Sequence, residues 1–165
     1  MAVTILAVDD EPIVLALLKD YLEGVGYNVL IAGDGYSAIS MFAQGKPRLV
    51  ILDFNMPAGT GGDVFERIRG RADGAMVPVI FLTAAELSEV RMHVPPADNV
   101  RLLSKPVDFI QLEAALKELL GPAAAPKPAA AAPAPPKPAF DGESQEEGPG
   151  AVLDLDADDT PPAKR

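Results

Sequence analysis

The chain has 165 residues, with 24 acidic and 14 basic side chains, one histidine, no cysteine and a formal net charge of −10. The absence of cysteine excludes disulfides and thiolate metal sites, which fits a cytoplasmic location. The acidic balance disfavours a nucleic-acid partner. No apolar run approaches the ~20 residues that span a bilayer, so we also predict no membrane insertion.

The composition changes at Gly121, which divides the chain into two parts. Residues 122–165 contain 10 prolines and 12 alanines, and their last part is rich in acidic side chains. Such a segment has too little apolar surface to offset the entropy of ordering it. We therefore predict a folded domain over residues 1–121 and a disordered Ala/Pro-rich linker with an acidic tail over 122–165.

Within residues 1–121, predicted strands and helices alternate. Apolar runs indicate five strands, at 3–8, 27–31, 48–53, 77–82 and 100–104, and the first and third of these runs end in acids. The first helix is expected to begin at Pro12 and to carry Ile13, Leu17, Tyr21 and Val25 at helical spacing. Two further helices are predicted at 34–43 and 63–71, the latter with Val64, Phe65 and Ile68 facing inward.

The last two helices differ in length. The fourth can extend only from Ala85 to about Met92, because Pro95 and Pro96 follow. The fifth has Asp108 as its cap, Gln111 at the capping-box position and Gly121 at its end. Its apolar stripe is Phe109, Leu112, Leu116, Leu119 and Leu120. Five successive strand–helix units predict an α/β fold, a doubly wound parallel sheet with helices on both faces.

Polar residues stand where the predicted strands end. Asp9 and Asp10 follow the first strand, Asp53 ends the third, Thr83 follows the fourth, and Lys105 follows the fifth. In parallel sheets these ends lie at one edge, where ligands bind. Carboxylates crowded there repel one another unless a cation lies among them, and Mg²⁺ suits such a set. With a lysine and a hydroxyl opposite, the edge could stabilise a transferring phosphoryl group.

These residues stand in four motifs: Val8-Asp9-Asp10-Glu11-Pro12, Leu52-Asp53-Phe54-Asn55-Met56-Pro57, Leu82-Thr83-Ala84 and Ser104-Lys105-Pro106. In this order the set resembles the receiver domains of two-component response regulators, over residues 3–120. The resemblance implies a flavodoxin-like, CheY-like (βα)5 fold with strand order 2-1-3-4-5. It also implies phosphorelay signalling, in which a sensor histidine kinase or a phosphotransfer protein supplies phosphate and an unknown output protein responds.

The resemblance also implies roles for individual residues. Asp53 would be the phosphoacceptor, and Mg²⁺ would be held by Asp10, by Asp9 partly through water, by Asp53 and by the backbone carbonyl of Asn55. Thr83 would be the switch hydroxyl, and Lys105 would pair with the phosphate. The bond between Lys105 and Pro106 would be cis.

Three features depart from the family pattern. Leu102 stands where the family usually has a switch aromatic, the loop at 57–62 contains three glycines, and the fourth helix is short. We therefore expect phosphorylation to change loop order at 57–62 and 84–98 rather than to rotate an aromatic side chain. Output would then pass through the face formed by the fourth helix, fifth strand and fifth helix, or through the tail.

Other functions remain open at this point. An aspartyl-phosphate hydrolase-like enzyme of related topology would normally carry a second acid where this chain has Asn55, and would need a cap domain. A receiver-like scaffold that is never phosphorylated would need a broken acceptor set, whereas this set is intact. We expect self-catalysed phosphoryl transfer to and from Asp53 but no turnover enzyme. His93 is expected to be a solvated surface residue.

Overall fold

The structure is a computed structural model that describes residues 2–57 and 60–121. Its strands are β1 (Thr4–Val8), β2 (Asn28–Ala32), β3 (Leu49–Asp53), β4 (Val79–Thr83) and β5 (Val100–Ser104). Its helices are α1 (Pro12–Gly24), α2 (Gly35–Gly45), α3 (Gly61–Arg69), α4 (Leu87–His93) and α5 (Phe109–Leu120). The predicted tail at 122–165 lies outside the described residues.

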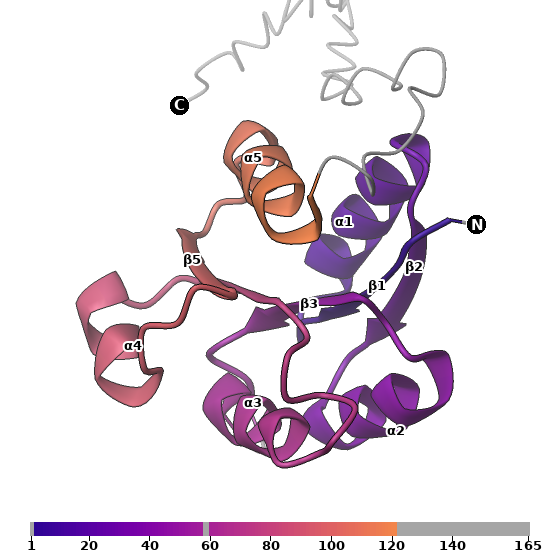
Figure 1. The fold of residues 1–165 in the computed structure, drawn as a ribbon. Helices are drawn as coiled ribbons and strands as arrows, with labels where there is room; N and C mark the ends of the chain where they lie inside the picture. The colour runs from indigo at the N-terminus through magenta and orange to yellow at the C-terminus, as the bar shows by residue number, and fades with distance from the viewer. Residues whose placement is uncertain (1, 58–59, 122–165) are drawn as a thin grey trace, which may run out of the picture. The chain divides into compact units, whose positions relative to one another are not determined.

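The five strands form one parallel sheet in the order β2-β1-β3-β4-β5. Helices α1 and α5 cover one face, and α2, α3 and α4 lie on the other (Figure 1). The prediction of an α/β, doubly wound, flavodoxin-like sheet with order 2-1-3-4-5 is confirmed. Strand order reverses beside β1 and β3, where the carboxyl ends of a sheet leave a crevice for ligands.

The sheet divides the hydrophobic core into two layers. Side chains alternate along a strand, so Ile5 and Ala7 of β1 face α1 and α5, while Leu6 and Val8 face α2 and α3. Strands β3 and β4 are buried along their whole length. This two-sided burial explains why the strands read as continuous apolar runs.

Helix α1 buries a different stripe from the predicted one. Leu18 is 1% exposed and Leu15 and Leu22 are also buried, whereas Ile13 is 75% exposed. Leu17 is exposed as well, and Tyr21 is only partly buried. The apolar spacing that predicted this helix therefore does not mark its buried stripe, because a second apolar stripe, Leu15, Leu18 and Leu22, packs against the sheet.

The bounds of α2 and α3 also differ from the predicted ones. Asp34 precedes α2 as its cap, and its Oδ1 accepts from the Ser37 N–H at 2.8 Å. Thr60 and Asp63 form a capping box, so α3 begins at Gly61 rather than at Asp63 and ends at Arg69. The inward side chains of α3 are confirmed, since Val64, Phe65 and Ile68 are buried.

The fifth helix follows its prediction closely. Asp108 Oδ1 accepts from the N–H groups of Ile110 and Gln111. The Gln111 side chain donates to the other Asp108 oxygen rather than closing a full capping box. Of its predicted stripe, Leu112 and Leu116 are buried, and the three remaining members, Phe109, Leu119 and Leu120, are partly buried.

The bounds of β5 agree with the prediction, and the other strands and α4 shift by one or two residues, with β4 starting at Val79 and α4 covering Leu87–His93. Thr83 is thus the last residue of β4 rather than the residue after it. Within residues 2–57 and 60–121, no helix is both long and apolar enough to cross a membrane.

The two stripes of α1 give a direct test of the packing. Leu18→Ala is expected to lower the free energy of unfolding by about 2–5 kcal/mol, because it leaves a cavity between α1 and the sheet. Ile13→Ala should change it by no more than about 0.5 kcal/mol, as is usual for an exposed side chain. Urea denaturation of both variants checks this, and equal losses would contradict the observed orientation of α1.

Candidate functional site

The sheet brings the predicted polar residues to one edge. Asp9 directly follows β1, Asp53 ends β3, and Lys105 directly follows β5. Backbone hydrogen bonds continue the strand pairing to this edge, from Asp9 N to Ala32 O at 3.2 Å and from Lys105 N to Thr83 O at 2.8 Å. The regular sheet therefore fixes the backbone of the site residues.

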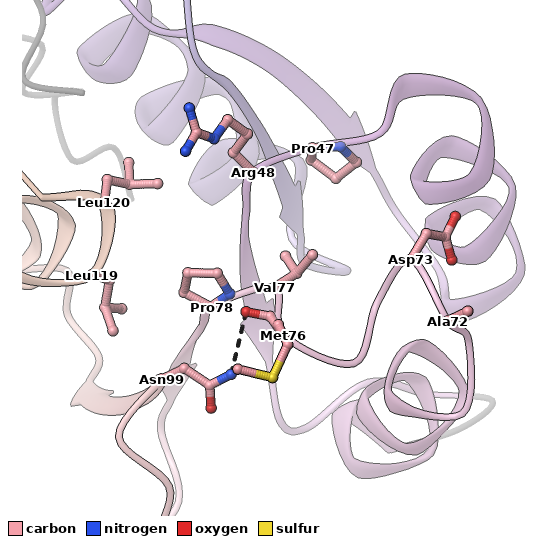
Figure 2. A pocket seen from close by; sticks show the side chains of 10 residues that line it. All are labelled: Pro47, Arg48, Ala72, Asp73, Met76, Val77, Pro78, Asn99, Leu119 and Leu120. Carbon is pink, nitrogen blue, oxygen red and sulfur yellow. Dashed lines mark hydrogen bonds between the residues drawn. The ribbon is translucent and has the colours of Figure 1, made fainter. Parts of the chain in front are cut away.

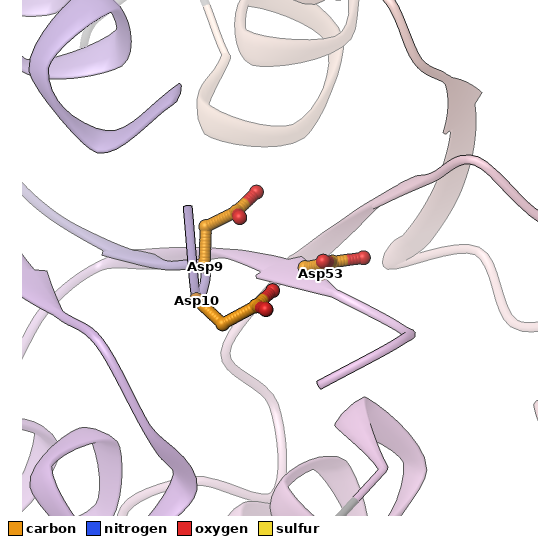
Figure 3. A group of neighbouring side chains, drawn as sticks. All are labelled: Asp9, Asp10 and Asp53. Atoms are coloured by element: carbon orange, nitrogen blue, oxygen red, sulfur yellow. The ribbon is translucent and has the colours of Figure 1, made fainter. Parts of the chain in front are cut away.

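Three carboxylates cluster at this edge (Figure 3). One oxygen from each of Asp9, Asp10 and Asp53 lies within 4.8 Å of the others. Asp9 is 1% exposed and Asp53 is 3% exposed, whereas Asp10 lies outside the buried core. Two buried charges of the same sign at this spacing require a cation nearby.

Lys105 supplies positive charge to the cluster. Its Nζ lies 2.9 Å from Asp9 Oδ2, 3.0 Å from Glu11 Oε1 and 3.1 Å from Asp53 Oδ2. Its side chain is mostly buried, so these contacts are poorly screened by water. One ammonium thus faces three carboxylates, so Lys105 and its three partners together carry a net negative charge.

Burial and these contacts shift the pKa values of Asp53 and Lys105. Burial raises the pKa of Asp53, and the Asn55 N–H and Lys105 oppose that rise without cancelling it. Burial lowers the pKa of Lys105, but its contacts with Asp9, Glu11 and Asp53 outweigh burial and leave that pKa above its ordinary value. The site therefore holds a firmly protonated lysine beside a carboxylate whose charge is incompletely compensated.

The donor set fits a small divalent cation. Asp9 Oδ2 is buried and receives no aligned hydrogen bond from the described part of the chain, although Lys105 Nζ lies 2.9 Å away. Asp10 and Asp53 place further oxygens beside it. A few carboxylates with space for water and phosphate oxygens are the ligands that Mg²⁺ prefers.

Thr83 and Asn55 lie beside the cluster. Thr83 is fully buried, and its Oγ1 accepts from the Ala85 N–H at 3.0 Å, so the hydroxyl is engaged with its own loop. The Asn55 N–H donates to Asp53 Oδ1 at 3.1 Å. The peptide bond from Lys105 to Pro106 is cis.

Glu11 and Gly61 belong to the site region but were not predicted as site residues. Glu11 contacts Lys105 through its side chain, and its N–H donates to Asp9 Oδ1 at 2.9 Å. Gly61 packs against the end of β3, where an added Cβ would lie 2.1 Å from the Asp53 carbonyl oxygen. In the sequence, only the presence of a glycine shortly after Asp53 could have indicated this close approach.

The glycine-rich loop is therefore shorter than predicted. Gly61 and Gly62 form the first turn of α3, and Gly59 lies outside the described residues.

Leu102 is partly buried in β5 and packs against the core layer on the side of α2 and α3. His93 is exposed, as predicted, and its ring centroid is 5.9 Å from that of Phe54.

A separate pocket lies at the opposite end of the sheet (Figure 2). Arg48 and Pro78 directly precede β3 and β4, and Leu119 and Leu120 end α5. Its charged residues are Arg48 and Asp73, and Asp73 is already paired with Arg71 at 2.9 Å. This pocket contains none of the clustered acids, so the carboxyl edge remains the candidate functional site.

The raised pKa of Asp53 predicts how the site affects stability. The pKa of Asp53 is higher in the folded protein than its ordinary value of 3.8. The contribution of this group to the free energy of unfolding is therefore fully present below pH 3.8, and it is lost as the pH rises through the folded pKa. Above that folded value the ionised side chain opposes folding, so Asp53→Asn should raise the melting temperature in metal-free buffer. Thermal unfolding across pH checks this: the gain should vanish below that ordinary pKa, and a destabilised variant at pH 7 would contradict it.

The geometry agrees with comparisons to known proteins. The chain is 35% identical over 118 residues to the probable transcriptional regulatory protein TcrX of Mycobacterium tuberculosis, covering 72% of this chain and 50% of that protein. The chain spans about half the length of the curated relatives it matches.

Solved structures give the same result. The chemotaxis protein CheY4 of Vibrio cholerae matches with a TM-score of 0.68 and 25% identity, covering 72% of this chain and 99% of that one. The receiver domain of sensor histidine kinase PA1611 from Pseudomonas aeruginosa, with a magnesium ion coordinated in its active-site cleft, matches with a TM-score of 0.66 and 26% identity over 73% of this chain and 98% of that one. Residues 5–117 match the response regulator receiver domain, and the chain belongs to that family.

Proposed function

We propose that Asp53 accepts a phosphoryl group from the phosphohistidine of a sensor kinase or phosphotransfer protein. A carboxylate oxygen of Asp53 attacks phosphorus, the bond from phosphorus to the imidazole nitrogen breaks, and its electron pair stays on that nitrogen. The other nitrogen of the donor imidazole carries a proton, so the products are an acyl phosphate on Asp53 and a neutral histidine on the donor. The observation that carries the proposal is the contact of buried Asp53 with Lys105 inside the acid cluster.

Burial and charge suit Asp53 to this role. Its raised pKa makes its oxygens more basic than those of a solvated carboxylate, while the contact with Lys105 favours the ionised form. Asp9 is equally buried, and each of these two carboxylates accepts one backbone N–H, Asp9 from Glu11 and Asp53 from Asn55. Asp10 is more solvated and so lacks the destabilised charge that favours nucleophilic attack.

Asp9, Asp10, Asp53 and the backbone carbonyl of Asn55 would hold Mg²⁺ at this edge. The carboxylate spacing and the buried Asp9 oxygen support that assignment, as does the magnesium ion in the related PA1611 receiver domain. The bound ion would neutralise charge on the cluster and on the phosphoryl oxygens.

Lys105 and Thr83 would respond to the new phosphate. Lys105 Nζ already lies 3.1 Å from Asp53 Oδ2, so it can pair with a phosphoryl oxygen attached there. Thr83 would turn its hydroxyl toward the phosphate and give up the hydrogen bond from Ala85. That exchange would connect phosphorylation to the loop before α4.

The chain would then act through protein contacts. A phosphohistidine protein would be the donor, and an output protein would bind the face formed by α4, β5 and α5 or the tail. Receiver domains are in general signalling proteins rather than turnover enzymes. Asn55 argues further against an aspartyl-phosphate hydrolase, because its amide cannot serve as the general acid–base that a carboxylate supplies at that position.

Phosphorylation by a small donor tests the proposal. With Mg²⁺ and acetyl phosphate, intact mass spectrometry should detect one added phosphoryl group on the full chain. Asp53→Asn and chelation of the metal should each abolish the addition, since the first removes the nucleophile and the second the counter-charge. Asp73→Asn, which alters an exposed ion pair, is the matched control and should react as the parent does. Modification of Asp53→Asn, or none in the parent, would refute the proposal.

The Thr83 contact predicts a change in hydrogen exchange. When the phosphoryl mimic beryllofluoride is bound, the Ala85 amide should exchange at least severalfold faster, because Thr83 Oγ1 no longer accepts its hydrogen bond. Thr83→Val should show fast exchange at Ala85 without the mimic. Changes confined to β5, with residues 84–98 unaffected, would contradict the expected role of loop order.

A further inference from the structure

We propose that Glu11 competes with the phosphoryl group for Lys105 and thereby slows phosphorylation of Asp53. This inference rests on the proposed function and adds a residue that the acceptor set does not include. Glu11 acts through Lys105, so it is a positioning residue rather than a catalytic one.

The backbone places Glu11 so that its side chain is available to the site. Glu11 is the N-cap residue of α1, yet its carboxylate makes no capping hydrogen bond. Its N–H donates to Asp9 Oδ1, which fixes the loop from β1 to α1 against the acid cluster. From there Glu11 Oε1 accepts a hydrogen bond from Lys105 Nζ at 3.0 Å, across 94 positions of the sequence.

The surroundings of Lys105 are crowded. An ammonium group has three N–H donors, and Lys105 Nζ already donates to Glu11 and Asp53. Asp9 Oδ2 lies 2.9 Å from Nζ on a third side, without an aligned hydrogen bond. A phosphoryl oxygen on Asp53 must therefore share Lys105 with these carboxylates, and its pairing with Nζ strengthens when one of these contacts is given up or lengthened.

Glu11 is the contact that is released most easily. Its side chain is 59% exposed, so water can solvate the freed carboxylate. Asp9 and Asp53 are almost completely buried, and a buried charge that loses its partner is strongly destabilised. In addition, the proposed cation would compensate Asp9 and Asp53, whereas Glu11 is not part of the three-carboxylate cluster.

Two effects of Glu11 therefore oppose phosphorylation. It occupies Lys105 before transfer, and it adds negative charge beside the position of an anionic phosphoryl group. Removing its charge should favour the phosphorylated state without changing the fold, since Glu11→Gln keeps the size and the backbone N–H.

The rate of acetyl phosphate labelling, followed by intact mass, gives the first test. Glu11→Gln should react about two- to fivefold faster than the parent, the range expected for loss of one exposed ion pair. Glu86→Gln is the matched control, because Glu86 is the N-cap residue of α4, also makes no capping hydrogen bond and lies at the same edge of the sheet. Glu86→Gln should react at the parent rate. A faster rate in Glu11→Gln alone would then come from its contact with Lys105 and not from the loss of one negative charge.

A metal-free measurement tests the contact itself. Melting temperatures of the parent, Glu11→Gln, Lys105→Met and the double variant should not be additive, because Glu11→Gln removes a partner only while Lys105 is present. Calorimetric titration with Mg²⁺ should give similar affinities for Glu11→Gln and Glu86→Gln.

Each contrary result has a distinct meaning. An unchanged or slower rate in Glu11→Gln, or additive melting temperatures, would overturn the competition. A much weaker Mg²⁺ affinity in Glu11→Gln than in Glu86→Gln would also overturn it, by making Glu11 part of the metal site. Failure of the parent chain to be labelled at all would instead refute the proposed function, while the metal-free cycle would still test the contact.

Discussion

The site depends on the crowding of negative charge at the carboxyl edge of a parallel sheet. Asp9 and Asp53 are buried side by side, and Lys105 is the cation that contacts both. The sheet forces this arrangement, because β1, β3 and β5 all end at the same edge. Folding therefore stores an electrostatic imbalance at this edge, and an additional cation or a rearranged lysine relieves it.

That imbalance connects stability with signalling. In the proposed function, the charge that makes Asp53 costly to bury would also make it a suitable nucleophile, and the lysine that limits this cost would pair with the phosphate. Two neighbouring hydrogen bonds would then be replaced by bonds to the phosphate. One joins the Ala85 N–H to Thr83 in the loop before α4, and the other joins Lys105 to Glu11. A modification at one carboxylate can thus affect both the loop before α4 and the start of α1.

The sequence predicted the sheet and the clustering of most candidate site residues, because both follow from local patterns. Continuous apolar runs mark strands buried on both faces, and the polar residues at the ends of β1, β3, β4 and β5 lie at the edge where parallel sheets bind ligands. Contact with the sheet decided which stripe of α1 is buried, since Ile13 and Leu18 are equally apolar. The contact of Glu11 with Lys105 joins distant parts of the chain, and the close approach of Gly61 to β3 depends on the capping box at Thr60. Local patterns carry little information on such contacts.

The charge balance at Asp53 can be measured directly by carbon-13 NMR titration of its carboxyl group, without and with Mg²⁺. We predict a pKa above the ordinary value of 3.8 in the metal-free protein, because burial outweighs the Asn55 and Lys105 contacts. We also predict that Mg²⁺ lowers this pKa, since the ion favours the charged form. A metal-free pKa at or below the ordinary value, or one that Mg²⁺ leaves unchanged, would contradict an unbalanced negative charge at this edge of the sheet.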